Sequence, residues 1–329
     1  MKKLLLVLVS AILAVSVITG CSENKSTQAS SNESNETVLR IAAQPYPLYT
    51  PVYVAYRLGY LDEELNAVGA KYEWKSFKSG PLVNEAVAAG EADLGFMADL
   101  PAIIAKSTGL PIEVVSNVAY GEKGIAVLAK ADSPIKSVAD LKGKKVAYAT
   151  GSYAQHLLAL LLSKEGLTLN DVQSVNLGAG DQPAALASGE VDAIVIWEQY
   201  ISQLTSDGTA KVIADGTGVK RGNMVTYAVS DYANKNPKVI EAYIKALNRA
   251  DEVIKNEPEK AAEAVAEDFG VSKELMLKII PNFTFSTEFT EDDIAEIKNV
   301  KDFSLESGII SKDVDIDSFI NKKYLDDIK

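Results

Sequence analysis

The chain has 329 residues, 47% of them hydrophobic and 24% charged, and its formal net charge is −12. A chain of this length is too long for one small hydrophobic core and suits about two domains. The excess of negative charge argues against nucleic acid and anionic lipid surfaces as partners. With a single cysteine the chain cannot form an internal disulfide, so its stability depends on the burial of apolar surface.

The first residues have the pattern of a secretory leader. A basic start, Lys2-Lys3, is followed by apolar or small residues up to Ile18 and then by Thr19-Gly20-Cys21. The apolar run is shorter than the roughly 20 residues that a membrane-spanning helix needs. We therefore expect a signal peptide over residues 1–20, and the loss of its two lysines makes the net charge −14.

The cysteine follows this leader directly. Ile18-Thr19-Gly20-Cys21 resembles the bacterial lipobox, in which the cysteine is lipidated and becomes the first residue of the mature protein. The alternative is a secreted protein with a coincidental cysteine. Residues 22–37 carry almost no apolar side chains, so residues 21–37 are expected to form a disordered tether. Together these patterns predict a protein held by a lipid anchor on the extracytoplasmic face of the cell membrane.

Beyond Val38, short apolar runs alternate with helix-period segments, which is typical of an α/β fold with largely parallel sheets. Two portions of the chain repeat the same order of elements. The strands expected in the first portion are residues 38–43, 71–77, 92–97 and 112–118, and those in the second are 145–149, 172–177, 191–196 and 211–214. The expected helices are residues 50–60, 82–89, 154–164, 184–188, 237–256, 258–269 and 273–280.

One repeated stretch is especially clear. Residues 85–99 (EAVAAGEADLGFMAD) and 184–198 (AALASGEVDAIVIWE) both have an alanine-rich helix, Gly-Glu, an acidic residue and an apolar strand. Gly-Glu-x-Asp alone is a common helix-to-strand turn, in which glycine ends the helix and the carboxylates face solvent. Repetition of the whole series predicts two similar lobes. Their expected limits are 38–126 plus 228–329 for lobe 1 and 127–227 for lobe 2, with crossings near 124–130 and 225–229.

Ligands of open α/β sheets bind beyond the carboxyl ends of the strands, so two facing lobes predict one cleft lined by both sets of strand ends. The candidate ligand-binding residues are Gln44, Tyr46, Ser79, Gly80, Asp99, Leu100, Gly121, Gly151, Ser152, Tyr153, Gln155, Trp197 and Glu198.

The sequence offers little catalytic chemistry. His156 is the only histidine, and there is no Gly-x-Ser-x-Gly elbow, Cys-His pair, metal-ligand set or phosphate-binding loop. The carboxylates that could form an acid–base pair also suit a simpler role as solvated strand-end residues; they are Asp99, Glu122, Asp181 and Glu198. We expect no catalysis, no metal and no cofactor.

Binding has a better physical basis at two helix starts. In Thr150-Gly151-Ser152 a strand turns through glycine into a helix, whose first N–H groups and dipole favour an anion. Lys78-Ser79-Gly80-Pro81 repeats this arrangement in the first portion. The alternative for Ser152 is a plain N-cap. Trp197 either covers an apolar part of the ligand or belongs to the core, and His156 is expected to be a structural or rim residue.

At these residues the chain resembles a known family, the solute-binding proteins of ABC importers for aliphatic sulfonates and taurine, close to those for nitrate and pyrimidine precursors. The resemblance covers residues 39–319 and rests on QPYPLYTPVYVA, FKSGPLVNEAVAAGEADLGFMADLPAI, DSPIKSVADLKGKKVAYATGS, ALASGEVDAIVIW and GIISKDVDI. It implies a two-lobed type II periplasmic-binding-protein fold, with helices near the C-terminus packed on lobe 1. It also implies a monomer that closes on a small anionic ligand and docks on an ABC permease and its ATPase.

The chain departs from the family pattern at two places. Ala98-Asp99-Leu100-Pro101 stands where the family has Gly-Asp-x-Pro, and Tyr153 and Gln155 stand where Ser or Thr and His are usual. No arginine falls on a strand end, so a sulfonate would rest on neutral donors and helix dipoles. Nitrate or a pyrimidine-like ring sandwiched by aromatic residues remains an alternative ligand. An enzyme of the same fold, acting on a sulfinate or a pyrimidine, is the alternative class.

Overall fold

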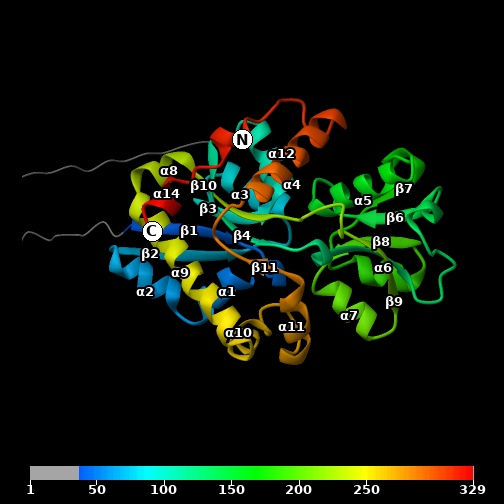
Figure 1. Ribbon diagram of the computed structural model, residues 1–329, viewed down its shortest axis with the longest axis horizontal. Coiled ribbons are helices and arrows are strands. Elements are labelled where there is room, and N and C mark those ends of the chain that lie inside the picture. Colours follow the sequence, from blue (N-terminus) through cyan, green and yellow to red (C-terminus); the bar gives the residue numbers. More distant parts are fainter. Residues whose placement is uncertain (1–36, 329) are drawn as a thin grey trace, which may run out of the picture. The chain divides into compact units, whose positions relative to one another are not determined.

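Two β-sheets organise residues 37–328, the part of the chain that the computed structural model describes (Figure 1). The expected signal peptide, Cys21 and the tether up to residue 36 lie outside the described residues. The first sheet has the strand order β11-β4-β10-β3-β1-β2, and the second has the order β7-β6-β8-β5-β9.

The strands of the first sheet are β1 (Thr37–Ala43), β2 (Ala70–Ser76), β3 (Leu94–Ala98), β4 (Ile112–Tyr120), β10 (Met224–Val229) and β11 (Thr284–Phe285). Those of the second sheet are β5 (Ile125–Lys130), β6 (Lys145–Tyr148), β7 (Gln173–Asn176), β8 (Ala193–Trp197) and β9 (Ala210–Asp215). The helices up to β9 are α1 (Thr50–Arg57), α2 (Tyr60–Ala67), α3 (Gly80–Ala88), α4 (Asp99–Ser107), α5 (Tyr153–Lys164), α6 (Gln182–Ser188) and α7 (Tyr200–Ser206). Those after β10 are α8 (Ser230–Lys235), α9 (Pro237–Asn256), α10 (Pro258–Val265), α11 (Lys273–Ile279), α12 (Glu291–Glu306), α13 (Ile316–Phe319) and α14 (Lys323–Asp326).

The two sheets share one internal order, as the sequence repeat predicts. In the first sheet β1 pairs in parallel with β2 and β3, and in the second β6 pairs in parallel with β7 and β8. An antiparallel strand then follows in each, β10 beside β3 and β5 beside β8. The α/β fold with a repeated βαβ core is therefore confirmed, although the sheets are mixed rather than largely parallel.

The crossings between the sheets lie beside the strands expected to contain them. β5 pairs along its whole length within the second sheet, so the first crossing is the short segment between Tyr120 and Ile125. β10 belongs wholly to the first sheet, so the chain returns over residues 216–223. β5 and β10 are both apolar and buried on two faces, so each suits a central position in a sheet better than an exposed connection between sheets.

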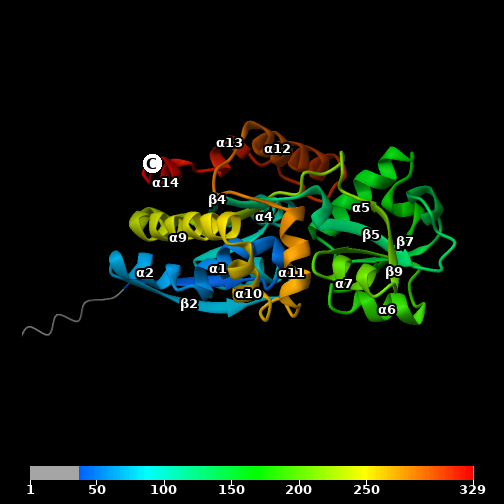
Figure 2. The same ribbon diagram turned by 60° about the horizontal axis from the view of Figure 1, so that its bottom comes forward.

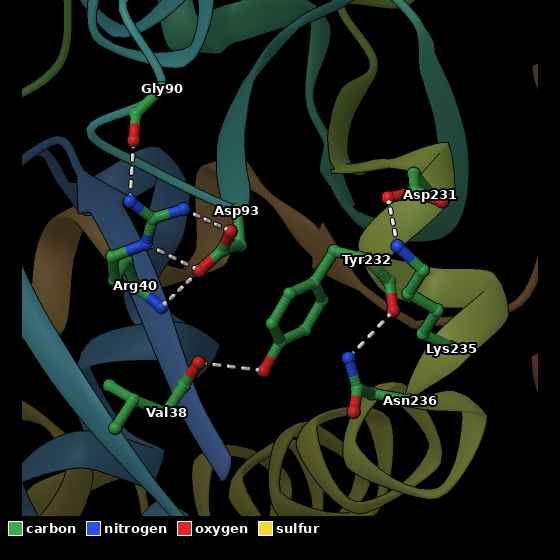
Figure 3. A network of polar contacts seen from close by, with 8 residues as sticks. All are labelled: Val38, Arg40, Gly90, Asp93, Asp231, Tyr232, Lys235 and Asn236. Carbon is green, nitrogen blue, oxygen red and sulfur yellow. Dashed lines mark hydrogen bonds and ion pairs between the residues drawn. The ribbon is translucent and has the colours of Figure 1, made fainter.

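In the Gly-Glu-x-Asp turns Glu91, Glu190 and Asp192 are exposed, as expected, but the two aspartates also have a structural role. Asp93 is buried, and its carboxylate accepts hydrogen bonds from the backbone N–H of Arg40 at 3.0 Å and from its guanidinium Nε at 2.8 Å (Figure 3). In the second sheet Asp192 accepts from the backbone N–H of Lys145 at 2.8 Å. Each aspartate thus fixes the neighbouring parallel strand to the turn, which explains why the motif occurs twice.

Helices from the C-terminal part of the chain pack on the first sheet, as expected. α9 runs beside α1 and α2, and α12 packs on α4 (Figure 2). Strand β10 contributes side chains to the apolar layers on both faces of the sheet. Met224 and Ala228 belong to the cluster under α9. Val225 and Tyr227 belong to the cluster under α4 and α12. Alternation along one strand therefore holds helices to both faces.

Candidate functional site

A small cavity lies where the carboxyl ends of strands from both sheets meet. Its lining residues are Gln44, Tyr46, Leu48, Tyr49, Ser79, Gly80, Ala98, Pro101, Ser152, Tyr153, Trp197 and Met224. We call this space the inner cavity. Its volume is about 30 Å³, above the roughly 10–15 Å³ that a cavity needs to hold one water molecule. None of the lining residues carries a charge, so any anion held here must rest on neutral donors.

Two buried donors of the inner cavity have no hydrogen-bond partner within residues 37–328. They are the hydroxyl of Tyr153 and Nε1 of Trp197. Burial raises the pKa of Tyr153 well above 10, and the charge of Asp99 adds to this, so the phenol keeps its proton and remains a donor. The ring of Trp197 meets that of Tyr46 edge to face, with centroids 5.5 Å apart. Because unpaired buried donors are costly, they indicate a place for an acceptor.

The start of α3 is an open helix N-terminus at this cavity. Ser79 is its N-cap but accepts no hydrogen bond with its side chain, and Pro81 has no N–H to offer. Gly80 is required by space, because a Cβ there would lie 2.8 Å from Cγ and 2.9 Å from Cβ of Pro101. The N–H groups of the first turn of α3 thus face the cavity region without a side-chain cap.

The start of α5 differs, because its own side chains satisfy it. The hydroxyl of Ser152 donates to the carbonyl of Ala149 at 2.6 Å and accepts from the N–H of Ala154 at 3.2 Å. Ser152 is therefore the N-cap of α5, the structural alternative left open by the sequence. The N–H of Gly151, which has a φ of +72°, donates to Oε1 of Gln155 at 2.8 Å.

Asp99 and Leu100 lie behind the inner cavity rather than on its wall. Asp99 is 1% exposed and accepts two hydrogen bonds from Nζ of Lys220, at 3.0 and 3.1 Å. Lys220 is itself fully buried, on the segment that returns from β9 to β10. Leu100 is packed in the core under α4. Sequence reasoning missed Lys220, since the contact joins residues 121 positions apart and no local pattern marks it.

Gly121 lies in the first crossing, and Glu198 directly follows β8. Glu198 accepts from the N–H of Ser202 at 3.0 Å, from the hydroxyl of Ser202 at 2.8 Å and from Nδ2 of Asn282 at 3.1 Å. Burial raises the pKa of Glu198, and these hydrogen bonds oppose the rise. Gly121 follows β4, and a Cβ there would overlap the carbonyl oxygen of Asn282. Both residues therefore hold the segment near Asn282 against the second sheet.

His156 is a buried structural residue rather than a rim residue. It is 2% exposed, both ring nitrogens lack a partner within residues 37–328, and its ring lies 4.8 Å from that of Phe303. Burial lowers its pKa well below 6.5, and the charge of Lys220 lowers it further, so the imidazole is neutral at pH 7. A lone neutral histidine inside an apolar contact has no acid–base partner for catalysis.

A larger groove adjoins the inner cavity and shares Tyr46 and Ser79 with it. Its volume is about 690 Å³, within the range of small-molecule sites. We call it the outer groove. Its other lining residues are Pro45, Lys78, Pro81, Leu82, Ala149, Thr150, Asn176, Gly178, Ala179, Gly180, Asp181, Gln199, Tyr200, Glu267, Asp268, Phe269 and Gly270.

Seven of the thirteen residues predicted from the sequence therefore line the inner cavity. They are Gln44, Tyr46, Ser79, Gly80, Ser152, Tyr153 and Trp197. Asp99, Leu100, Gly121, Gly151, Gln155 and Glu198 do not line it. The lining residues that were missed are Leu48, Tyr49, Ala98, Pro101 and Met224. They are apolar or aromatic neighbours of strand ends, which a sequence pattern does not separate from core residues.

Residues 37–328 contain no group of three or more histidine, cysteine, aspartate or glutamate side chains placed to hold a metal ion. No helix in this part of the chain combines the length and apolar character needed to cross a membrane.

Known proteins share this architecture. Residues 46–261, more than half of the chain, match the family model described as NMT1/THI5 like. An aliphatic sulfonates-binding protein of Escherichia coli (strain K12) is 30% identical over 293 residues, which cover 88% of this chain and 91% of that protein.

Two solved structures extend the comparison. The alkanesulfonate-binding protein SsuA from Xanthomonas axonopodis pv. citri, bound to MOPS, has a TM-score of 0.79 and 26% identity, covering 87% of this chain and 98% of that one. The periplasmic aliphatic sulphonate-binding protein SsuA from Escherichia coli has a TM-score of 0.74 and 30% identity, covering 86% and 97%. The periplasmic-binding-protein fold and the resemblance seen in the sequence are thus confirmed, and the chain belongs to the NMT1/THI5-like family, among the relatives of aliphatic sulfonate-binding proteins.

Proposed function

We propose that the protein is the solute-binding component of an ABC importer and that it captures an aliphatic sulfonate or taurine. The observation that carries this proposal is the inner cavity, where Tyr153 and Trp197 present buried donors that have no partner among residues 37–328, near the open start of α3. A sulfonate is a permanent anion with three acceptor oxygens and no proton to donate. It suits neutral donors and a helix N-terminus. The names of the relatives support the same ligand class.

The size of the two spaces suggests how such a ligand lies. The inner cavity, at about 30 Å³, has room for part of an anionic head and not for an organic chain as well. Tyr46 and Ser79 also line the outer groove of about 690 Å³. We therefore place the sulfonate in the inner cavity and its organic part toward the outer groove.

The proposed role is capture without chemistry. The carboxylates near the cavity are engaged by other groups, Asp99 by Lys220 and Glu198 by Ser202 and Asn282. His156 is neutral, buried and in contact with the ring of Phe303. The relatives with sulfonate in their names are binding proteins. The proposal would be overturned by turnover of the added sulfonate in the presence of the protein alone.

The cellular setting is also a proposal. We place the protein as a monomer on the extracytoplasmic face of the cell membrane, with Cys21 lipidated and residues 21–37 as the tether. Docking on a permease with its ATPase completes the importer. Metabolic labelling with a palmitate analogue should then mark the wild type but not a Cys21→Ala variant, and an unlabelled wild type would contradict the anchor.

Ligand binding is tested directly by isothermal titration calorimetry and thermal shift with the purified protein. The ligands are taurine, ethanesulfonate, longer alkanesulfonates, sulfate, nitrate and pyrimidines. A ligand present at 100 times its Kd should stabilise the protein by about 2.7 kcal/mol. We expect the shift with one or more sulfonates. A shift with nitrate or a pyrimidine and with no sulfonate would replace the proposed ligand, and no shift with any compound would contradict the receptor role.

A further inference from the structure

The strand-to-helix turn before α5 has its amide groups occupied by side chains of the same chain. The N–H of Thr150 donates to Oδ1 of Asn176 at 3.0 Å, and the N–H of Gly151 donates to Oε1 of Gln155 at 2.8 Å. Ser152 caps the N–H of Ala154. In each case a neutral oxygen sits where an anionic oxygen could be held by a helix N-terminus.

Gly151 lies between the two spaces of the site. Its neighbour Thr150 lines the outer groove, and its other neighbour Ser152 lines the inner cavity. A Cβ at Gly151 would lie 3.8 Å from Cγ of Pro81 and 3.9 Å from Cδ1 of Ile104, so this turn faces the start of α3 and the middle of α4. Its φ of +72° also requires glycine. The amide of Gly151 is thus placed beside the route that a ligand head must take.

Two side-chain donors of the inner cavity are free, unlike the N–H of Gly151. The hydroxyl of Tyr153 and Nε1 of Trp197 are buried and unpaired within residues 37–328, and Ser79 leaves the first turn of α3 without a side-chain cap. These free donors come from both lobes and line one cavity. The N–H of Gly151, in contrast, is occupied by the side chain of Gln155. This side chain is flexible and only partly buried on α5.

We infer that Gln155 is a specificity-determining residue that competes with the ligand for the N–H of Gly151. This inference rests on the proposed function, because the competing ligand is a sulfonate. An anionic oxygen makes a stronger hydrogen bond to an N–H than an amide oxygen does, and the dipole of α5 adds to the difference. A sulfonate therefore displaces Oε1 of Gln155, while neutral and weakly accepting ligands do not. The Gln155 carboxamide thus selects ligands whose head group carries a full negative charge.

The test compares the full-length protein with two variants at this position. Gln155→Met has a similar shape and helix preference but no oxygen, so it leaves the N–H of Gly151 free. Gln155→Glu keeps the oxygen and adds a negative charge that repels the ligand. Gln173→Met is the matched control, because the Gln173 side chain is exposed on β7 and donates to the carbonyl of Gly143 away from both spaces. The probes are ethanesulfonate, taurine and inorganic sulfate.

Three readouts are measured: Kd by calorimetry, the Tm without ligand, and the amide signal of Gly151 by NMR. We expect Gln155→Met to tighten ethanesulfonate binding about three- to tenfold, while its ligand-free Tm falls. Gln155→Glu should weaken binding at least about tenfold. Gln173→Met should leave Kd unchanged. In the wild type, the NMR chemical shift of the Gly151 amide should change when ethanesulfonate is added. The same addition should change it less in Gln155→Glu, in which the ligand is repelled from this N–H.

Other outcomes overturn the inference. An unchanged Kd in Gln155→Met with a lower Tm assigns Gln155 a purely structural role. Weaker binding in Gln155→Met shows that Gln155 holds the ligand instead of competing with it. If wild type binds none of the probes, the proposed function fails for these ligands. The inference then stands if Gln155→Met gains binding of any of them, and it is overturned if that variant also binds none.

Discussion

The role of the inner cavity in ligand binding can be tested by removing a single N–H group, that of Trp197. Its Nε1 is buried without a partner in the described residues, and its ring already packs edge to face on Tyr46. Trp197→Phe keeps most of the ring and removes the N–H. We expect sulfonate binding to weaken about tenfold, because the ligand loses one hydrogen bond to a charged group, while the Tm without ligand is unchanged or higher.

Calorimetry and thermal unfolding of the same samples check this prediction. Trp74→Phe is the control, because Trp74 stacks on Tyr56 at 4.5 Å and does not line the inner cavity. An unchanged Kd for Trp197→Phe would mean that the ligand does not use this donor, and the cavity would lose one of its two free groups.

Asp251 of α9 provides a pH-dependent test of a residue outside the site. Its Oδ1 is buried without a partner in the described residues, and burial, with the charge of Glu252, raises the pKa of Asp251 to about 8. The folded state therefore keeps its proton at a pH at which the unfolded state, with a pKa of 3.8, has lost it. The stability that this group contributes is complete below the unfolded pKa and is lost as the pH rises through 8.

Asp251→Asn removes this titration and keeps the shape of the side chain. We expect the variant to gain stability relative to wild type as the pH rises from 5 to 8, by at least about 1 kcal/mol over that range. Urea unfolding at both pH values measures the difference. Asp231→Asn, at an exposed ion pair with Lys235, should show a small and nearly pH-independent effect. Parallel pH profiles for Asp251→Asn and wild type would contradict the buried neutral carboxyl.

Helices and strands show where the sequence was informative. α9 was predicted with the limits it has, residues 237–256, because a proline opens it and an apolar stripe runs along its whole length. The helix expected at 50–60 is α1 and ends earlier, at Arg57, because Gly59 adopts a φ of +76°; α2, which follows, was not predicted. α12 was not predicted because its buried side chains include the polar Asp293 and Ser304, which weaken its apolar pattern. β11 has two residues and no periodicity to detect.

The candidate site was predictable to a similar extent and for a similar reason. Strand ends and helix starts follow from local pattern, so Gln44, Ser79, Gly80 and Ser152 could be named from the sequence. Which polar groups remain free could not be predicted, because it depends on partners far along the chain. Asp99 is taken by Lys220, a contact that no alternation of apolar and polar residues encodes.

The start of α3 leaves no room for added volume at the wall of the inner cavity. Gly80→Ala would place its Cβ 2.8 Å from Pro101 Cγ, and both residues line the inner cavity. We expect a loss of about 1–3 kcal/mol in stability from overpacking, together with weaker sulfonate binding because the first turn of α3 must move. Gly178→Ala is the control, since its nearest atom, Oδ2 of Asp181, lies at 3.6 Å. Denaturant unfolding and calorimetry distinguish the two variants, and equal stability would contradict the tight approach.

At the scale of the whole molecule, the two sheets and their crossings suggest lobes that move relative to each other. The limits 38–126 plus 228–329 and 127–227 stay a prediction. Lys220 is placed to link the two lobes during such a movement. It lies on the returning segment, pairs with Asp99 of α4 and places Nζ 5.5 Å from the ring centroid of Tyr153 on α5. Tyr153 in turn lines the inner cavity, so this fully buried lysine contacts both lobes and one wall of the site.

Removing one member of this buried ion pair should cost more than removing both. Lys220→Met leaves the Asp99 carboxylate buried without its partner, and we expect a loss of about 3–5 kcal/mol in the free energy of unfolding. The double variant Lys220→Met with Asp99→Leu should recover part of that loss, because only the partly exposed Glu296, 3.9 Å from Nζ of Lys220, then lacks its cation. Urea unfolding of wild type, both single variants and the double variant gives the coupling. Losses below about 1 kcal/mol in both single variants would show that solvent reaches the pair and that the crossing is held by other contacts.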